Sequence, residues 1–237
     1  MTACKQLTGS FSNVVAIAYT GPTAPTVEVG DTIRLTAHAL DAAGDSVPDA
    51  AVTWAVLELD TVRVGFSLDS TTGLITGLYP GSGRVVGAVE NLQTDPISVT
   101  VTARPDSIAL AGSPVDTVGP GAVASSPLET VLWDLTTTPG TSTPIAGKTV
   151  TYRLVEPTPG TAAAQGLGLA PAGGTVGTDT TQAAVLTDAN GVASAELLLL
   201  GSATPPDSAV VEAGALTALG DTVPGSPVRF VVYFITQ

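Results

Sequence analysis

The feature that most constrains the fold is an alternation of apolar and polar residues with a period of two, repeated in short runs along the chain. In one run Ile97, Val99 and Val101 alternate with serine and threonine residues. Because successive side chains of a β-strand point to opposite faces, such a run predicts one face on a core and one in water. The runs of the first half show no helical period. We therefore expect strands rather than helices.

Further runs predict the inward faces of five more strands. These faces are Val15, Ile17 and Tyr19; Ile33, Leu35, Ala37 and Ala39; Val52, Trp54 and Val56; Val131, Trp133 and Leu135; and Val150, Tyr152 and Leu154. Between runs, Ala43-Gly44-Asp45, Thr72-Gly73 and Gly81-Ser82-Gly83 are expected to form tight turns, because glycine adopts the positive φ angles that such turns need. Strands of this length and spacing favour antiparallel β-sandwiches.

Length and charge limit the class of protein. A chain of 237 residues suits one large domain or two of ordinary size. Its 21 acidic residues outnumber its 8 basic residues, which gives a formal net charge of −13. Such a field repels phosphate backbones, so no nucleic-acid partner is expected. No apolar run approaches the ~20 residues of a membrane-spanning helix, so no transmembrane segment is expected.

The first half carries a set of motifs known together from one domain family. Val29-Gly30-Asp31 opens a run, Trp54 lies in another, and Thr72-Gly73-Leu74-Ile75-Thr76-Gly77 is followed by Gly81. This combination resembles the group 2 bacterial immunoglobulin-like domain, over residues 13–104. The resemblance implies that Trp54 fills the core between two sheets. The alternative is that its ring stacks against a ligand.

Arg104-Pro105-Asp106 marks the predicted domain boundary, because proline cannot continue a strand ladder and restricts the residue before it. Residues 105–237 contain Pro-x-x-Gly-x-x-Val from Pro144 and Thr-Asp-x-x-Gly-x-Ala from Thr187. These patterns resemble the group 1 bacterial immunoglobulin-like domain of intimin- and invasin-type adhesins. Together the resemblances imply an all-β fold of two immunoglobulin-like antiparallel β-sandwiches in tandem. Segment 158–178, rich in Gly, Ala and Pro, fits less well and is expected to be an enlarged loop.

The stretch from Asp188 to Gly191 lies between two alternating runs and has the composition of a type I turn closed by a left-handed glycine. We expect it to form the corner of a hairpin. The alternative is a calcium loop, which needs about six to eight oxygen ligands, usually from several acids at alternate positions. Only Asp188 and Asn190 qualify locally, with Asp179 more distant. No metal site is therefore predicted.

No catalytic or cofactor-binding residue is predicted. His38 is the only histidine and lies on the polar side of its run, so a Ser-His-Asp triad would depend on it alone. Gly147-Lys148-Thr149 matches the end of a phosphate-binding loop, but the glycine required five residues earlier is replaced by Ser142, and a strand follows. A pair of carboxylates brought together by the fold is an open alternative. We expect a protein that is not an enzyme and holds no cofactor.

Residues 1–12 are expected to be a flexible N-terminal segment. Within it, Thr2-Ala3-Cys4 resembles the end of a bacterial lipobox, in which small residues precede a cysteine that is lipidated. On this interpretation Cys4 is the candidate lipidation site and membrane tether, and Met1 stands in place of a removed signal peptide. The alternative is an incidental free thiol. Cys4 is the only cysteine, so no intrachain disulfide is expected.

The final run, SPVRFVVYFITQ, has large apolar residues on both of its faces. Phe230 and its alternate neighbours fit a core, which leaves Val231, Tyr233 and Ile235 on the outward face. Soluble monomers seldom leave such a patch bare. Either segment 158–178 folds over it, or it contacts a protein partner or another copy of the chain, across the face or along an edge.

These features favour a non-enzymatic bacterial cell-envelope or surface module. We expect an extracellular protein, lipid-anchored to the outer membrane through Cys4, that acts as a structural spacer or adhesion-type rod of two domains placed end to end. One alternative is an assembly subunit of an extracellular filament or phage virion, in which case Met1 is native. Another is a carbohydrate-binding accessory module, which the aromatic content of 4% disfavours because glycan platforms need exposed rings.

Overall fold

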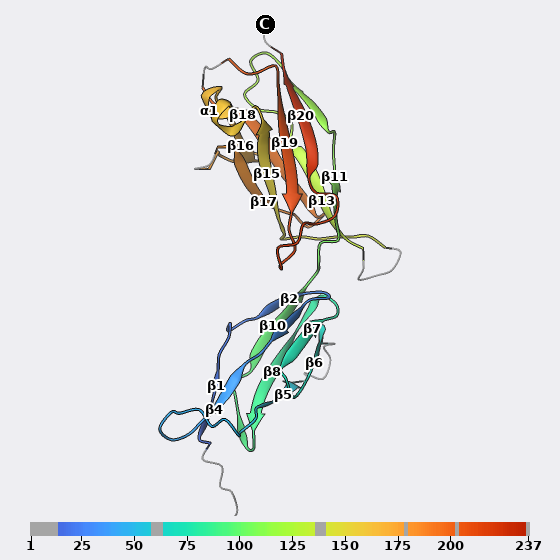
Figure 1. Cartoon of the computed structure of the whole chain (residues 1–237). Coiled ribbons are helices and arrows are strands. Elements are labelled where there is room, and N and C mark those ends of the chain that lie inside the picture. Colours follow the sequence, from blue (N-terminus) through green and yellow to red (C-terminus); the bar gives the residue numbers. More distant parts are fainter. Residues whose placement is uncertain (1–13, 58–63, 136–140, 178–179, 202–203, 236–237) are drawn as a thin grey trace, which may run out of the picture. The chain divides into compact units, whose positions relative to one another are not determined.

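In the computed structural model, strands make up nearly all of the regular structure. The structure describes residues 14–57, 64–135, 141–177, 180–201 and 204–235. The chain divides into two compact units, Met1–Thr102 and Ala103–Gln237 (Figure 1). The predicted flexible segment 1–12, with Cys4, lies outside the described residues.

The first unit is built from two layers of strands. One sheet has the order β2-β10-β8-β5, with β9 beside β8; the other layer consists of the sheet β3-β7-β6 and the pair β1-β4. The strands are β1 (Ala16–Tyr19), β2 (Thr26–Glu28), β3 (Thr32–Arg34), β4 (Ala37–Leu40), β5 (Thr53–Leu57), β6 (Phe66–Leu68), β7 (Leu74–Gly77), β8 (Gly81–Val89), β9 (Leu92–Gln93) and β10 (Ile97–Thr102).

The core of the first unit lies between these layers and is centred on Trp54. This side chain is buried, and its ring meets the ring of Tyr19 edge to face, with 6.4 Å between centroids. The predicted inward face of β10 is confirmed, because Ile97, Val99 and Val101 are all buried in the same cluster. The core assignment of Trp54 is confirmed as well.

The predicted turn at Gly81-Ser82-Gly83 is wrong, because these residues begin β8 and pair with β10. Glycine is needed here for space rather than for a turn. A Cβ on Gly83 would lie 2.8 Å from the ring of Phe66, and a Cβ on Gly87 would lie 3.2 Å from the ring of Trp54. Gly83 and Gly87 of β8 therefore make room for the aromatic side chains of the core.

The second unit also has two layers. One sheet has the order β11-β13-β18-β16, with β14 beside β13, and the other has the order β12-β20-β19-β15-β17. The elements are β11 (Ser107–Leu110), β12 (Val115–Val118), β13 (Leu128–Asp134), β14 (Thr143–Pro144), β15 (Thr149–Glu156), α1 (Pro159–Ala164), β16 (Leu167–Pro171), β17 (Gln182–Leu186), β18 (Val192–Leu199), β19 (Ser208–Ala215) and β20 (Val228–Phe234).

Tyr152 crosses the core of the second unit and joins its two sheets. It lies on β15, and its hydroxyl donates to the carbonyl of Ala193 on β18 at 2.6 Å. Because that proton is used, the same oxygen accepts from Thr130 on β13, 2.9 Å away. Burial raises the pKa of Tyr152 to about 12, while the hydrogen bond from Thr130 opposes the rise.

The predicted all-β sandwich fold is confirmed, but the sheets are not purely antiparallel. In each unit the first strand ends early, and the chain switches to the other sheet across a short stretch that contains Gly and Pro, 20–25 and 111–114. The new strand then runs parallel to the last strand, so β2 pairs with β10 and β12 pairs with β20. This shared topology is that of an immunoglobulin-like sandwich.

Segment 158–178 is not the enlarged loop that the sequence predicted. It contains the short helix α1 and the strand β16, which pairs with β18. Leu167 and Leu169 of β16 are fully buried in the core. The strand needs a glycine at position 168, because a Cβ there would lie 2.7 Å from the side chain of Leu200. The glycine and alanine content of the segment therefore resembles that of a loop although part of it is a strand.

The inward face of β13 was also predicted wrongly. Leu128, Thr130 and Leu132 face the core, whereas Trp133 is only partly buried on the opposite face and Leu135 is exposed. Both faces of this strand carry apolar residues, so the alternation alone did not decide between them. The buried polar group of Thr130 is satisfied by its hydrogen bond to Tyr152.

Candidate interaction site

The outward side of β20 is the candidate site. Its inward residues Phe230 and Val232 are fully buried. On the other face, Tyr233 is 49% exposed, Ile235 just beyond the strand is 55% exposed, and Val231 is partly buried. The structure thus places the three predicted residues outward; that they form a contact surface is still a prediction.

Neighbouring strands extend this apolar surface. Val231 is paired with Val115 of β12 on one side and with Val210 of β19 on the other, and directly paired residues share a face. Tyr233 is flanked in the same way by threonine and serine. We call Val115, Val210, Val231, Tyr233 and Ile235 the β20 face. Val210 is only 5% exposed, so the solvent-facing part of this surface comes from Val115, Val231, Tyr233 and Ile235.

An ion pair bounds the β20 face at one end. The guanidinium of Arg229 on β20 lies 3.2 Å from the carboxylate of Glu156, and Arg229 is also paired across the ladder with Glu212. Both partners of the ion pair are more than half exposed, so its contribution to stability is small. The pair places charged groups at the Arg229 end of the β20 face, where Glu156 is also paired with Val210.

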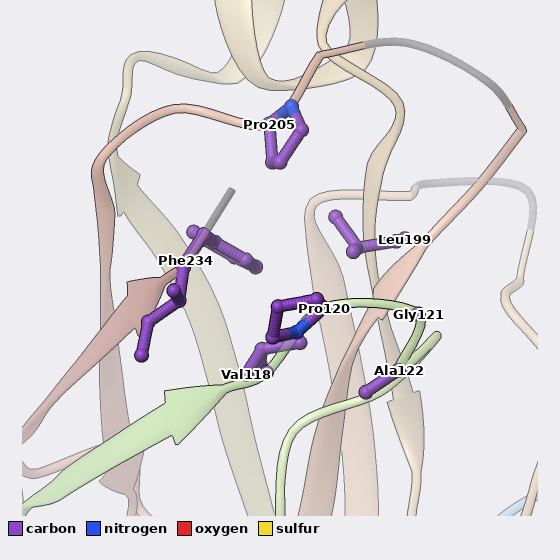
Figure 2. Close-up of a pocket in the computed structure, with 9 residues that line it drawn as sticks. Val118, Pro120, Gly121, Ala122, Leu199, Pro205 and Phe234 are labelled. Carbon is purple, nitrogen blue, oxygen red and sulfur yellow. The ribbon is translucent and has the colours of Figure 1, made fainter. Parts of the chain in front are cut away.

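An apolar pocket of about 470 Å³ lies at the other end of the β20 face. It is lined by Val118, Gly119, Pro120, Gly121, Ala122, Leu199, Pro205, Phe234 and Ile235. Figure 2 shows Pro120, Leu199, Pro205 and Phe234 arranged around the hollow. No lining residue is charged, and Ile235 belongs to both the pocket and the face. The two features therefore form one uncharged surface suited to apolar groups.

Segment 158–178 does not cover the β20 face as one alternative predicted. Its strand β16 belongs to the sheet β11-β13-β18-β16, whereas β20 belongs to the other sheet. Segment 158–178 therefore does not pack against the outward side of β20. Within the described residues, Tyr233 and Ile235 are left open to solvent.

The Asp188 corner is a turn whose carboxylate is held by backbone amides. Gly191 has φ 73°, and its amide donates to the carbonyl of Asp188 at 3.0 Å. The amides of Val192 and Asn190 donate to the Asp188 carboxylate at 2.9 and 2.8 Å. These bonds hold the pKa of Asp188 below its usual value. The hairpin prediction is wrong, since β17 and β18 belong to different sheets.

The same turn recurs at two other places, which supports a structural role. At Asp41 the amides of Gly44 and Asp45 donate to the carbonyl and the carboxylate of that residue. At Thr217 a hydroxyl replaces the carboxylate as acceptor for the amide of Asp221. A motif that works with either acceptor does not depend on a bound cation.

The other residues singled out in the sequence are not brought together. His38 is exposed on β4, and Lys148 directly precedes β15, a strand rather than a helix. Among the described residues there is no group of three or more His, Cys, Asp or Glu placed to hold a metal ion. In the same part of the chain, no helix is long and apolar enough to span a membrane.

Sequence reasoning missed Val115, Val210 and the whole pocket. Val115 reaches the β20 face only because β12 runs parallel to β20, a pairing between residues that lie more than a hundred positions apart. The pocket lining comes from four separate stretches of chain. No local pattern signals such an arrangement, although Pro114 and Pro120 do mark the ends of β12.

Comparisons with known proteins show low similarity. No protein-family model matches the chain, and no curated protein matches it. Among solved structures, the chain is similar to the adhesin InvE of Yersinia pseudotuberculosis, with 15% identity over 96% of this chain and 62% of that one, and a TM-score of 0.38. It is also similar to fibronectin(III)-like modules of Clostridium thermocellum CbhA, with 13% identity over 92% and 93% of the two chains and a TM-score of 0.35.

A third similar structure is that of domains 1–6 of the surface layer protein SbsC, with 15% identity, a TM-score of 0.33, and coverage of 87% of this chain and 23% of that one. The chain therefore spans less than two thirds of the adhesin and less than a quarter of the surface layer fragment. The assignment of the two units to group 2 and group 1 is still a prediction.

Proposed function

We propose that the chain is a non-enzymatic module of the bacterial cell surface, a spacer or adhesion-type protein whose second unit contacts a protein partner. The observation that carries this proposal is the β20 face with its adjoining pocket. Tyr233 and Ile235 are about half exposed beside an uncharged hollow of about 470 Å³. Apolar patches of this kind mark contact surfaces on soluble proteins.

The chemistry of the face favours a protein over a glycan. Among the described residues Tyr233, which is 49% exposed, is the only exposed aromatic side chain, since Tyr19, Tyr79 and Trp133 are partly buried and the others are buried. Sugar-binding platforms stack pyranose rings on exposed aromatic faces, and a single ring offers little area. Tyrosine beside aliphatic side chains is instead typical of the centre of protein–protein interfaces.

The proposal includes the domain ranges and the location. Residues 13–104 and 105–237 form two domains, and Cys4 tethers the chain to the outer membrane. The resemblance to bacterial immunoglobulin-like domains supports an extracellular place, as does the net charge of −13, which favours solubility and disfavours nucleic-acid binding. An assembly subunit of a filament or virion would use the same β20 face to contact its neighbours.

The test replaces Val231 and Ile235 together by threonine. The isosteric change at Val231 and the exposure of Ile235 leave the fold intact, so the thermal midpoint stays close to that of the wild type. Size-exclusion chromatography of gentle extracts from producing cells then shows wild-type chain in a larger complex and the variant released from it. A variant that loses stability places the face in the folding core instead, and one that elutes with the wild type refutes the contact.

A further inference from the structure

The peptide unit between Asn190 and Gly191 is a candidate for spontaneous chemical modification. An asparagine loses its side-chain amide when the backbone nitrogen of the next residue attacks the side-chain carbonyl carbon. A glycine in that place hinders the attack least, because it has no Cβ. Of the three asparagines of the chain only Asn190 precedes a glycine, whereas Asn13 precedes valine and Asn91 precedes leucine. Asn190 is also exposed to water.

The reaction needs water as its only co-reactant. A bond forms between the Gly191 nitrogen and the side-chain carbon of Asn190 and closes a five-membered imide, while the side-chain nitrogen leaves as ammonia and takes the Gly191 amide proton. Water then opens the imide at one of its two carbonyls. Cleavage of the new bond gives aspartate. Cleavage of the original peptide bond gives isoaspartate, whose main chain runs through the side chain and is one carbon longer.

Three hydrogen bonds hold this peptide unit in the folded second unit. The Gly191 amide donates to the carbonyl of Asp188 at 3.0 Å, the Asn190 amide donates to the Asp188 carboxylate at 2.8 Å, and the Leu132 amide donates to the Gly191 carbonyl at 2.9 Å. Attack needs the nitrogen about 3–3.5 Å from the side-chain carbon and correctly oriented. The corner must therefore open first. Loss of three hydrogen bonds of ordinary net strength makes the open state on the order of a hundredfold rarer.

The folded corner also has no room for the longer main chain of isoaspartate. Gly191 is buried, and even one added carbon, a Cβ, would lie 2.7 Å from the carbonyl oxygen of Leu132 and 2.9 Å from the amide nitrogen of Ile145. The similar turns at Gly44 and Gly220 have nothing within 4 Å of such a carbon. Of these three turns, the one that contains the reactive pair is thus also the enclosed one.

We propose that Asn190 is a modification site that reacts when the second unit unfolds, and that isoaspartate at this position prevents the unit from folding again. The aspartate product keeps the normal main chain and has its new carboxylate at an exposed position, so it folds. Unfolding of the second unit is therefore followed by a chemical step that removes molecules from the folding equilibrium. This inference concerns the lifetime of the fold and does not depend on the β20 face.

The first experiment compares the rate of the reaction in the folded and the unfolded full chain. Purified protein is held in mildly alkaline buffer with a thiol reductant, either without denaturant or in guanidinium chloride. Peptide mass spectrometry after chromatographic separation measures aspartate and isoaspartate at position 190. Conversion should be on the order of a hundredfold faster in the denaturant. Equal rates in the two samples, or conversion of Asn91 as fast as that of Asn190 in the denaturant, would overturn the proposal.

The second experiment determines which product returns to the native fold. Chain aged in the denaturant is diluted into native buffer, and the refolded monomer is isolated by size-exclusion chromatography. The aspartate product should be recovered in the refolded fraction, and isoaspartate should be lost from it. Isoaspartate in a refolded monomer that melts like the wild type would contradict the proposed block to folding.

Two variants separate the extra main-chain carbon from other damage and from the new charge. The turns at Asp41 and Thr217 carry Ala43 and Leu219 in the place of Asn190, so the turn does not require asparagine. Asn190→Ser cannot form the imide and should refold completely after the same treatment. Freshly made Asn190→Asp should fold and melt close to the wild type. An equal loss of refolding for Asn190→Ser, or a failure of fresh Asn190→Asp to fold, would overturn the proposal.

Discussion

The two units share a strand topology but fill their cores with different aromatic side chains. In the first unit Trp54 is seated among glycines, since a Cβ on Gly73 or Gly87 would lie within 3.2 Å of its ring system. In the second unit Tyr152 occupies the core and its hydroxyl bonds to both Ala193 and Thr130 of the opposite sheet. The first core depends on the space that glycines leave for Trp54, and the second also depends on the hydrogen bonds of Tyr152.

The difference shows that the same sandwich can be held together in two ways. Among the described residues, the buried cluster of the first unit has nine members and that of the second has 24. The smaller core depends more on Trp54, its largest side chain. The larger core tolerates a polar atom at its centre because that atom is fully hydrogen-bonded. Variants that act on one unit and spare the other test this comparison.

The largest expected effect comes from Trp54→Ala. Removal of the main side chain of the smaller core should destabilise the first unit by about 3–5 kcal/mol, a large part of the stability of an ordinary domain. Hydrogen exchange measured by mass spectrometry should show faster opening of residues 14–102 and unchanged protection of the second unit. Trp133→Ala, at a partly buried outward position, should cost only about 1 kcal/mol; equal costs would contradict the core assignment.

The next prediction compares the stability cost of replacing a glycine with positive φ in each unit. Gly191→Ala should cost roughly 2–4 kcal/mol, because left-handed backbone is strained for alanine and its Cβ would lie 2.7 Å from the carbonyl oxygen of Leu132. Gly44→Ala has the same kind of φ, 86°, but nothing within 4 Å of the new Cβ. It should cost roughly 1–2 kcal/mol. Urea unfolding measures the loss of stability of each variant. Equal losses for Gly191→Ala and Gly44→Ala would mean that the close contact with Leu132 does not matter.

A smaller effect is expected from Tyr152→Phe. The change removes two buried hydrogen bonds, one from the Thr130 hydroxyl and one to the Ala193 carbonyl, which should cost about 1–3 kcal/mol. Tyr19→Phe is the matched control, since its hydroxyl donates to Pro22 at an exposed position. Wild-type stability in the second unit should fall as pH rises from about 10, the usual tyrosine pKa, to about 12, the value in the folded protein. The phenylalanine variant should lack this fall.

The smallest effect concerns one turn in each unit. Backbone amides of Thr72 and Thr71 lower the pKa of Asp69, as those of Val192 and Asn190 lower that of Asp188. A carboxyl group whose pKa is lowered on folding stabilises the fold at pH values above its unfolded pKa of about 4. This stabilisation is lost as the pH falls through the pKa of the folded state. Asn substitution at either site should remove a small acid-dependent shift of the melting temperature in its own unit. A shift in the other unit would contradict the local assignment.

The sequence predicted those strands in which one face is clearly apolar. Ile97, Val99 and Val101 alternate with polar residues and are buried as expected. The period does not identify the inward face where both faces are apolar, as on β13, because Leu132 and Trp133 are both suited to the core and the choice depends on packing against the opposite sheet. Strand β16 was missed because a glycine in a strand looks like a turn residue.

The candidate site was only half predictable. The outward position of Tyr233 and Ile235 follows from the period of β20 alone. The remainder of the β20 face and its pocket depend on pairings between distant segments, such as Val115 with Val231. These pairings carry no local signal, since register between strands far apart in sequence is set by the whole fold.

The central claim is that the second unit of a surface-exposed protein makes the contact through the β20 face. It is tested most directly by labelling single-cysteine positions with a membrane-impermeant maleimide on intact producing cells and on purified protein, with the wild type as background for Cys4. Thr32→Cys, exposed in the first unit, should label in both settings. Ile235→Cys should label when purified and be protected on cells. Labelling of both positions only after lysis, or equal labelling of Ile235→Cys in both settings, would contradict the claim.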